Sequence, residues 1–309
     1  MIYVITGQTA TGKTARALEL AEQHNGELIN CDSRQIYKQL DIITGKDLSL
    51  TTRIFTYWKT ISSFDIGYYS LEGNERLWLY DIISPHFIFS AFEYRSLAVE
   101  VIRDIEKRGK TPIIVGGTYF YLQHLLYDIL DQPIPANPTL RAELEQHSTE
   151  MLQKMIIIEA PDTFATLNNS EKHNRQRLIR KIEVIRAGSI VQPPKSEEYT
   201  YVLPFSAESV LIEGYHFENR EKLTIVIRQR IQARLTAGAI GEVENLLKAG
   251  YTGLEPGLQT IGYIQIINYL KKELSYEEMI HEWTTREIQY AKRQYTFAKR
   301  DPNISWIEV

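Results

Sequence analysis

The 309-residue sequence predicts an α/β fold, in which helices flank a parallel sheet, together with a small all-helical insertion domain. Apolar runs rich in β-branched residues at 2–6, 28–31 and 111–115 predict buried strands. Residues 14–22 and 91–108 place apolar side chains at helical spacing. Strands that alternate with helices in this way are typical of a parallel sheet, which binds ligands at the carboxyl ends of its strands.

Two proline-rich breaks, at 132–135 and 192–194, enclose a stretch that is charged and helical in pattern as far as residue 187. We predict an insertion domain there, between two parts of one α/β core. The predicted boundaries are 1–128 for the first part of the core, 129–187 for the insertion domain, and 188–309 for the second part of the core with its C-terminal helices.

The remaining segments carry less specific patterns. Residues 211–215 predict one more strand, and residues 219–300 predict mostly helix with an interruption at 250–257. The aromatic-rich stretch 49–74 predicts either a hairpin or an ordered loop. The sequence assigns no chemistry to this stretch.

The composition limits the class of protein. The chain is 43% hydrophobic and 24% charged, as is typical of a soluble globular protein. No apolar run has membrane-spanning length and no signal-peptide pattern precedes the first strand, so we expect a cytoplasmic protein that does not bind membranes. Cys31 is the only cysteine, which argues against disulfides and cysteine-based zinc sites. The net charge of −4 argues against a globally basic nucleic-acid binder but allows local basic patches.

The most specific motif is a phosphate-binding loop. Between the first predicted strand and the first predicted helix, the chain fits the pattern G-x-x-x-x-G-K-[ST] with Gly7-Gln8-Thr9-Ala10-Thr11-Gly12-Lys13-Thr14. Backbone N–H groups, the helix N-terminus and the Lys13 ammonium would hold a di- or triphosphate, and the Thr14 hydroxyl would hold Mg²⁺. The fold expected from this loop is P-loop NTPase-like.

Two other predicted strands end in polar or glycine-rich turns. The strand at 28–31 leads to Asp32-Ser33, and the strand at 111–115 leads to Gly116-Gly117-Thr118. Because parallel strands end at the same edge of a sheet, we expect these turns to meet the phosphate loop in one crevice. Asp32 is a candidate general base or metal ligand there, and Thr118 offers a hydroxyl. Turn formation or helix capping is the alternative explanation of both turns.

Two segments concentrate Lys and Arg, with a single acidic residue in each. They are residues 172–186, which include Arg177 and Arg180, and residues 286–300, in which aromatic side chains lie between the basic ones. Basic side chains interleaved with aromatic rings suit phosphates and unstacked bases. A solvated helix face is the alternative for each segment taken alone.

Further motifs follow along the chain in a fixed order. They are Asp32-Ser33-Arg34-Gln35-Ile36-Tyr37-Lys38, Leu40-Asp41-Ile42 with Thr44 and Lys46, Asp81-Ile82-Ile83-Ser84-Pro85, Tyr121 after the 116–118 turn, Gln176-Arg177-Leu178-Ile179-Arg180 with Glu183-Val184, Arg230, Gln259, Ile261-Gly262-Tyr263, and Ala291-Lys292-Arg293-Gln294 with Thr296. With these motifs the chain resembles the tRNA dimethylallyltransferase (tRNA isopentenyltransferase) family over nearly its whole length.

The resemblance implies a prenyl transfer. Dimethylallyl diphosphate would give its five-carbon group to N6 of the adenosine just 3′ of the tRNA anticodon, and diphosphate would leave. The resemblance further implies Asp32, Thr118 and Arg230 as catalytic residues, with Asp32 the general base, residues 7–14 as the diphosphate-binding loop, and Mg²⁺ at Thr14. Contacts to the anticodon stem-loop are implied for Asp32, Ser33, Arg34, Gln35, Arg141, Gln176, Arg177, Leu178, Ile179, Arg180, Lys292 and Arg293. We expect a monomer.

The chain departs from the family pattern at a few positions. Val226 stands where an arginine is common, and Arg228 is the candidate to replace it. The alternatives are a small-molecule kinase built on the same loop, an adenylate isopentenyltransferase that acts on free AMP or ATP, and an RNA-binding protein without activity. Intact Lys13, Thr14 and Asp32 argue against the last of these.

Overall fold

The computed structural model divides the chain into two compact units. Unit 1 joins Met1–Tyr127 to Tyr201–Val309, and unit 2 is Asp128–Thr200. The residues that the structure describes are 1–46, 54–70, 75–127, 134, 137–188, 199–202 and 204–309. In this part of the chain, no helix has both the length and the apolar character needed to cross a membrane.

Unit 1 is built on a sheet whose strands lie in the order β3-β4-β5-β2-β6-β1-β7-β8. The strands from β5 to β8 in this order run parallel, whereas β3, β4 and β5 pair antiparallel. The prediction of a parallel sheet is therefore wrong at this one edge, and the sheet is mixed. The bounds are β1 (Ile2–Gly7), β2 (Gly26–Asn30), β3 (Phe55–Ile61), β4 (Phe64–Ser70), β5 (Arg76–Trp78), β6 (Thr111–Val115), β7 (Val210–His216) and β8 (Ile304–Glu308).

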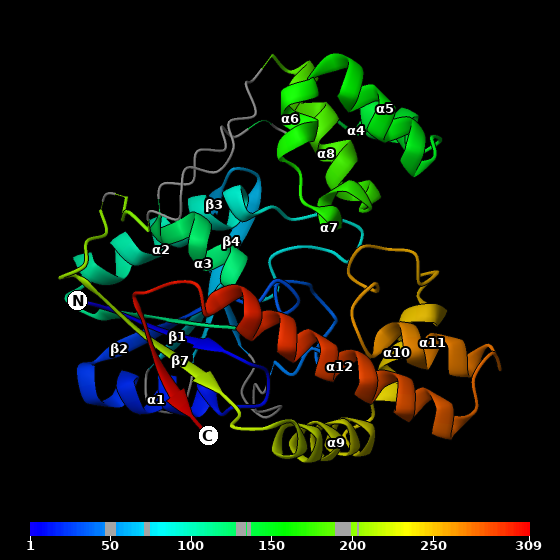
Figure 1. Cartoon of the computed structure of the whole chain (residues 1–309). Coiled ribbons are helices and arrows are strands. Elements are labelled where there is room, and N and C mark those ends of the chain that lie inside the picture. The colour runs from blue at the N-terminus through cyan, green and yellow to red at the C-terminus, as the bar shows by residue number, and fades with distance from the viewer. Residues whose placement is uncertain (47–53, 71–74, 128–133, 135–136, 189–198, 203) are drawn as a thin grey trace. The chain divides into compact units, whose positions relative to one another are not determined.

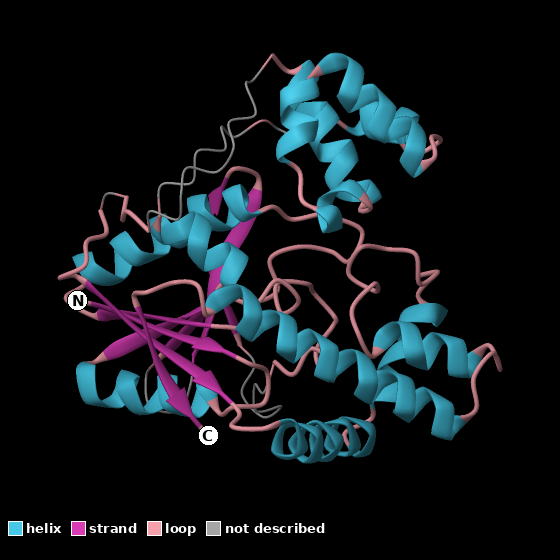
Figure 2. Cartoon of the chain, viewed as in Figure 1, coloured by secondary structure: helices cyan, strands magenta, loops and turns pink. Residues whose placement is uncertain are grey.

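Helices cover both faces of this sheet. Helix α1 lies on one face, α2 and α3 lie on the other, and α9 to α12 pack against one another beside the strands (Figures 1 and 2). The arrangement is the P-loop NTPase-like α/β fold that the sequence predicts. The helices of unit 1 are α1 (Lys13–His24), α2 (Ala91–Lys107), α3 (Tyr119–Leu126), α9 (Arg220–Thr236), α10 (Ala239–Lys248), α11 (Tyr263–Leu270) and α12 (Tyr276–Ala298).

Alternation along the strands builds the core. Ile5, Leu28 and Ile113 point to one side and form a buried cluster with Ala17 and Leu20 of α1. Helix α2 begins at a capping box, in which the Ser90 hydroxyl accepts the N–H of Glu93 and the Glu93 carboxylate accepts the N–H of Ser90. Local sequence thus determines where this helix starts, and burial of its apolar face holds it in place.

The described part of unit 2 is helical. Its helices are α4 (Pro138–Leu144), α5 (Thr149–Glu159), α6 (Pro161–Thr166), α7 (Asn169–Lys172) and α8 (Arg175–Arg186). Asparagine or serine side chains cap the N-termini of α4, α5, α7 and α8. Leu144, Leu152, Ile156, Leu167 and Leu178 belong to its own buried core.

Each strand expected from the sequence is found within two residues of its predicted ends. The described part of 49–74 is a hairpin of β3 and β4, so the hairpin alternative is correct there. Residues 47–53 and 71–74 lie outside the described residues. Strands β5 and β8 were not predicted. β5 is only three residues long, and β8 has polar residues in its pattern, so neither gives a clear signal.

Candidate active site

A cavity of about 840 Å³ lies at the carboxyl ends of β1, β2 and β6. The three predicted turns meet there, because the phosphate loop, Asp32 and Gly116-Gly117 all line it. The parallel order β2-β6-β1 produces this convergence, since it brings the ends of the three strands side by side. Residues 43–45, residues 259–261 and side chains of α9 and α12 complete the wall.

The phosphate loop has the backbone that its glycines permit. Gly7 has φ 117°, and a Cβ atom there would lie 2.1 Å from the carbonyl oxygen of Tyr215, so only glycine fits. Ala10 and Gly12 also have positive φ, and α1 begins directly after Gly12. The loop residues that line the cavity are Thr9, Ala10, Gly12, Lys13 and Thr14.

Gln8 and Thr11 of the loop are not among the residues that line the cavity. The Gln8 side chain is buried, donates to the carbonyl of Ala291 at 3.2 Å and accepts the N–H of Phe217 at 2.7 Å. The Thr11 hydroxyl donates to the carbonyl of Gln8 at 2.8 Å. Gln8 and Thr11 therefore support the loop by their side chains, and the adjacent residues face the cavity.

Two cations face the phosphate loop. Lys13 Nζ donates to the carbonyl of Gln8, and Arg230 Nη1 donates to Thr9 Oγ1 at 2.6 Å. Burial, together with the Arg230 charge, lowers the pKa of Lys13 to about 7, although Asp32 opposes this shift. An anion between Lys13 and Arg230 would relieve their repulsion, so the pair is suited to a diphosphate.

Thr14 offers the cavity a hydroxyl oxygen, a hard donor that suits Mg²⁺. Among the residues that the structure describes, His, Cys, Asp and Glu form no cluster of three that could hold a metal ion by itself. Mg²⁺ commonly takes one or two protein ligands and completes its shell with phosphate oxygens and water. The residues present therefore fit a magnesium ion that arrives with a diphosphate.

Asp32 lies in the turn after β2 and lines the same cavity as the phosphate loop. Its Oδ1 accepts the N–H of Arg34 at 2.8 Å, and its own N–H is accepted by Asn30 Oδ1 at 3.0 Å. Thr118 Oγ1 accepts the N–H of Ser33 at 3.0 Å and donates to Ser33 Oγ at 3.2 Å. Asp32, Arg34 and Gln35 line the cavity. The Thr118 hydroxyl is engaged by Ser33 and supports the Asp32 turn.

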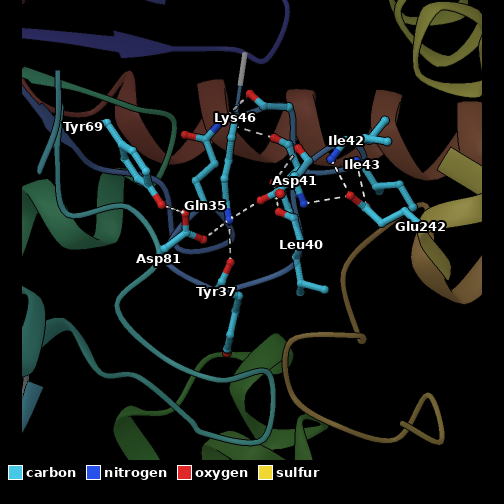
Figure 3. A network of polar contacts seen from close by, with 12 residues as sticks. Gln35, Tyr37, Leu40, Asp41, Ile42, Ile43, Lys46, Tyr69, Asp81 and Glu242 are labelled. Carbon is cyan, nitrogen blue, oxygen red and sulfur yellow. Dashed lines mark hydrogen bonds and ion pairs between the residues drawn. The ribbon is translucent and has the colours of Figure 1, made fainter. Parts of the chain in front are cut away.

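Residues 37–46, which follow the turn at Asp32, are held by the buried side chain of Lys46 (Figure 3). The Lys46 side chain has no exposed surface, and its Nζ donates to the carbonyl of Tyr37 at 2.6 Å, to Asp41 Oδ1 at 2.8 Å and to Asp81. The Tyr69 hydroxyl donates to the other Asp81 oxygen at 2.6 Å. All three ammonium protons have acceptors, which is the condition for burying this charge.

Glu242 of α10 holds the same segment from the other side (Figure 3). Its Oε2 accepts the N–H groups of Asp41 at 3.0 Å and Ile42 at 2.7 Å, and its Oε1 accepts the Tyr263 hydroxyl at 2.5 Å. The turn that it anchors ends at Gly45, against which the Arg230 guanidinium packs so closely that a Cβ atom would lie 2.5 Å from Nη2. Glu242 and Lys46 thereby shape the cavity wall that seats Arg230.

Arg228 does not take the place of the arginine that is missing at position 226. Of the described residues of α9, Val226, Gln229, Arg230, Ala233 and Arg234 line the cavity. Arg228 is exposed and lies outside that wall, because it points from another face of the helix. The cavity therefore has an apolar side chain at this position, and the prediction that Arg228 compensates is wrong.

Comparisons with known proteins agree with this geometry. The IPP transferase family model matches residues 70–301, and the isopentenyl transferase model matches residues 1–133. The tRNA dimethylallyltransferase of Anoxybacillus flavithermus is 33% identical over 100% of this chain and 90% of the relative. That of Endomicrobium trichonymphae is 33% identical over 99% of this chain and 94% of the relative.

The chain belongs to the tRNA dimethylallyltransferase family.

Solved structures support the assignment. The full-length tRNA isopentenylpyrophosphate transferase of Bacillus halodurans aligns with a TM-score of 0.64 at 27% identity, over 99% of this chain and 89% of the other. A eukaryotic dimethylallyltransferase that acts on tRNA shares the fold, with a TM-score of 0.75 at 24% identity over 99% of this chain and 73% of the other. Members of this family are prenyltransferases, so this chain is an enzyme of that class.

Sequence reasoning missed several residues that build this tRNA dimethylallyltransferase cavity. Tyr290 and Gln294 of α12 line it, and Glu242 and Lys46 hold its wall. Gln294 and Lys46 stand within the family motifs, but nothing in the local sequence indicates their contacts. The two basic residues predicted to contact tRNA on α12, Lys292 and Arg293, are both exposed, and Arg293 also lines the cavity whereas Lys292 does not.

Helix α8 of unit 2 carries most of the other residues implied in tRNA contact. Gln176 and Arg177 are exposed, whereas Leu178 and Ile179 are buried in the core of unit 2. The side chains of Leu178 and Ile179 therefore hold α8 in place by packing into that core.

Arg141 and Arg180 converge on the buried carboxylate of Glu183. Arg141 donates to both Glu183 oxygens at 2.8 Å, and Arg180 Nη1 donates to Oε2 at 3.1 Å. Burial alone would raise the pKa of Glu183, but the hydrogen bonds from Arg141, Asn137 and Arg180 hold it below its usual value. The two arginines thus stabilise unit 2 through Glu183.

Glu183→Gln tests this stabilisation through its pH dependence. We expect the substitution to lower the free energy of unfolding by about 1–3 kcal/mol at neutral pH. Because the folded-state pKa of Glu183 is lowered, its contribution is complete above the unfolded-state pKa and is lost as the pH falls through the folded-state value. Urea unfolding of the full chain, followed by circular dichroism, should show the difference between wild type and variant shrinking on acidification. A difference that stays constant with pH would contradict the role of the Glu183 charge.

Proposed function

We propose that this enzyme transfers the dimethylallyl group of dimethylallyl diphosphate to N6 of the adenosine just 3′ of the anticodon in tRNA and releases diphosphate. One observation carries the proposal. A single cavity is lined by the phosphate loop with Lys13 and Arg230 and by the carboxylate of Asp32. A leaving diphosphate and an amine that must lose a proton would meet there.

The residues of the cavity suit the negative charge that develops on the leaving diphosphate and the positive charge that develops on N6. The N6 lone pair attacks the allylic carbon, the carbon–oxygen bond breaks, and its electron pair leaves with diphosphate. The loop N–H groups, Lys13 and Arg230 would stabilise that negative charge. Asp32 would accept the N6 proton, because the attached carbon makes the amine acidic. Thr118 acts in this scheme through Ser33, next to Asp32.

Mg²⁺ is the cofactor that we propose. It would be held by the Thr14 hydroxyl and by oxygens of the donor diphosphate, and it would supply a positive charge to the leaving group. Support comes from the donor type that Thr14 presents to the cavity.

The acceptor in this proposal is the anticodon stem-loop. An adenine must leave the stack of the anticodon loop to reach a site inside the cavity, as with other base-modifying enzymes. Arg34, Gln35 and Arg293 are polar residues of the cavity that would contact the displaced adenosine and the RNA next to it. We further propose that the enzyme acts as a cytoplasmic monomer.

The decisive experiment incubates the full chain with dimethylallyl diphosphate, Mg²⁺ and unmodified tRNA, followed by mass analysis of the nucleosides. We expect N6-dimethylallyladenosine in the tRNA. Parallel reactions with AMP as acceptor, and with ATP and nucleosides, test the adenylate isopentenyltransferase and kinase alternatives, which the relatives do not favour. Prenylated AMP with unmodified tRNA, or ADP formation without prenyl transfer, would overturn the proposal.

Arg177→Ala tests the proposed role of α8. Because Arg177 is exposed and outside the core, its loss should weaken tRNA binding without unfolding unit 2. If Arg177 contacts one phosphate, the slope of log K against log salt should become less steep by about 0.7–0.9. Filter binding at several salt concentrations measures this slope.

Lys154→Ala, which removes an exposed charge from α5, is the matched control and should change neither the affinity nor the slope. An Arg177→Ala slope equal to that of the wild type would mean that this face of α8 is only solvated.

A further inference from the structure

Gln294 of α12 joins the phosphate loop to the turn that follows β6. Its Oε1 accepts the N–H of Thr9 at 2.8 Å, and its Nε2 donates to the carbonyl of Gly117 at 3.0 Å. The residue is only 8% exposed and lines the cavity. A carboxamide carries an acceptor and a donor on one planar group, so a single side chain makes both bonds.

The turn held by Gln294 is bonded to the chain on both sides of Asp32. The Thr118 N–H donates to the carbonyl of Cys31 at 3.2 Å, and the Thr118 hydroxyl accepts the N–H of Ser33 at 3.0 Å. Hydrogen bonds therefore lead from Thr9 through Gln294 and the Gly117-Thr118 turn to the neighbours of Asp32.

The contact depends on glycine at position 117. A Cβ atom there would lie 2.2 Å from Gln294 Nε2 and 3.4 Å from the carbonyl oxygen of Gly7. Helix α12 also holds the loop through Ala291, whose carbonyl accepts a bond from Gln8. The same 23-residue helix thus positions two consecutive loop residues against the turn.

We propose that Gln294 is a positioning residue that sets the distance between the diphosphate cradle and the segment that carries Asp32. The proposal rests on the proposed function, because it concerns the alignment of the leaving group with the proton acceptor. Gln294 bonds to the phosphate loop at Thr9 and to the turn after β6 at Gly117, and it takes no part in proton transfer. Misplacement of reacting groups by about 1 Å lowers rates by about 100-fold.

The test replaces Gln294 with methionine, which keeps the side-chain length and removes both bonds. We expect kcat for prenyl transfer to fall by about 10- to 100-fold. The dissociation constant for inorganic pyrophosphate should stay within about threefold of the wild-type value, because the loop itself is intact. Gln289→Met, on the exposed face of the same helix, is the matched control and should behave as wild type.

Three outcomes would overturn the proposal. An unchanged kcat with unchanged pyrophosphate binding means that the link has no role in transfer. An unchanged kcat with weaker pyrophosphate binding makes Gln294 part of the anion site instead. A kcat loss that is fully matched by the loss of folded protein makes its role merely structural. If Gln294→Met does not fold, Gln294→Asn, whose shorter stem cannot span both partners, is judged by the same measurements.

Hydrogen exchange separates this proposal from the proposed function. The Thr9 amide and the amides of residues 116–118 should exchange faster in Gln294→Met than in wild type and Gln289→Met, with or without turnover. Equal exchange rates overturn the positioning role. Failure of the wild type to prenylate tRNA overturns the proposed function but does not change the result of the hydrogen-exchange test.

Discussion

Replacing Asp32 with asparagine is expected to lower the turnover number of prenyl transfer by about 10²- to 10⁴-fold, as is typical for the loss of a general base. Asparagine keeps an oxygen that can accept the Arg34 N–H, now bonded to Asp32 Oδ1 at 2.8 Å, so the turn after β2 should survive. The amide cannot take the N6 proton. Single-turnover transfer of a radiolabelled prenyl group to tRNA measures the effect.

The Asp32→Asn variant should bind pyrophosphate about as well as the wild type, because the anion cradle lies on the phosphate loop and not on Asp32. Asp65→Asn removes a carboxylate from the exposed hairpin and serves as the matched control. Near-normal turnover in Asp32→Asn would remove Asp32 from the role of base and would require another group to accept the proton.

Lys13→Met should lower kcat/KM for dimethylallyl diphosphate by about 10²- to 10³-fold, the size of effect seen when one preorganised donor is removed from a developing oxyanion. Arg230, which donates to Thr9 of the phosphate loop, remains in the variant. Pyrophosphate affinity should therefore weaken without vanishing. Steady-state kinetics with a saturating tRNA concentration, together with calorimetric titration of pyrophosphate, measure the two effects.

Loss of a positive charge must be distinguished from loss of shape. Methionine has nearly the length of lysine and keeps the apolar stem of the side chain, so the packing around α1 should be conserved. Lys107→Met at the exposed end of α2 is the control and should leave both constants unchanged. If Lys13→Met reduces tRNA affinity but not donor affinity, the cradle would hold RNA phosphate instead of the donor diphosphate.

Much of the fold was predictable because its signals are local. The apolar run before Gly7, the glycines of the loop and the helix after it lie within some twenty consecutive residues. The meeting of Asp32 and Gly116 with the loop was also predictable, since parallel strands end at a common edge. The sequence did not decide between a hairpin and an ordered loop at 49–74, because the formation of β3 and β4 depends on pairing within the sheet.

The supporting residues of the site were not predictable in this way. Gln294 bonds to a residue 285 positions away, and Glu242 bonds to residues 199 to 201 positions away. Such contacts depend on how α10 and α12 pack against the sheet. Burial of Leu178 and Ile179, likewise, depends on which face of α8 meets the core of unit 2.

The sequence by itself determined the phosphate loop, the succession of strands and helices, and the family, because each of these is written in consecutive residues or in ordered motifs. Only the tertiary structure decided that Arg228 lies outside the cavity, that Arg141 and Arg180 pair with Glu183, and that Gln294 links the loop to the Asp32 segment. Backbone conformation follows from neighbours along the chain, whereas the partner of a side chain is chosen by packing between distant segments.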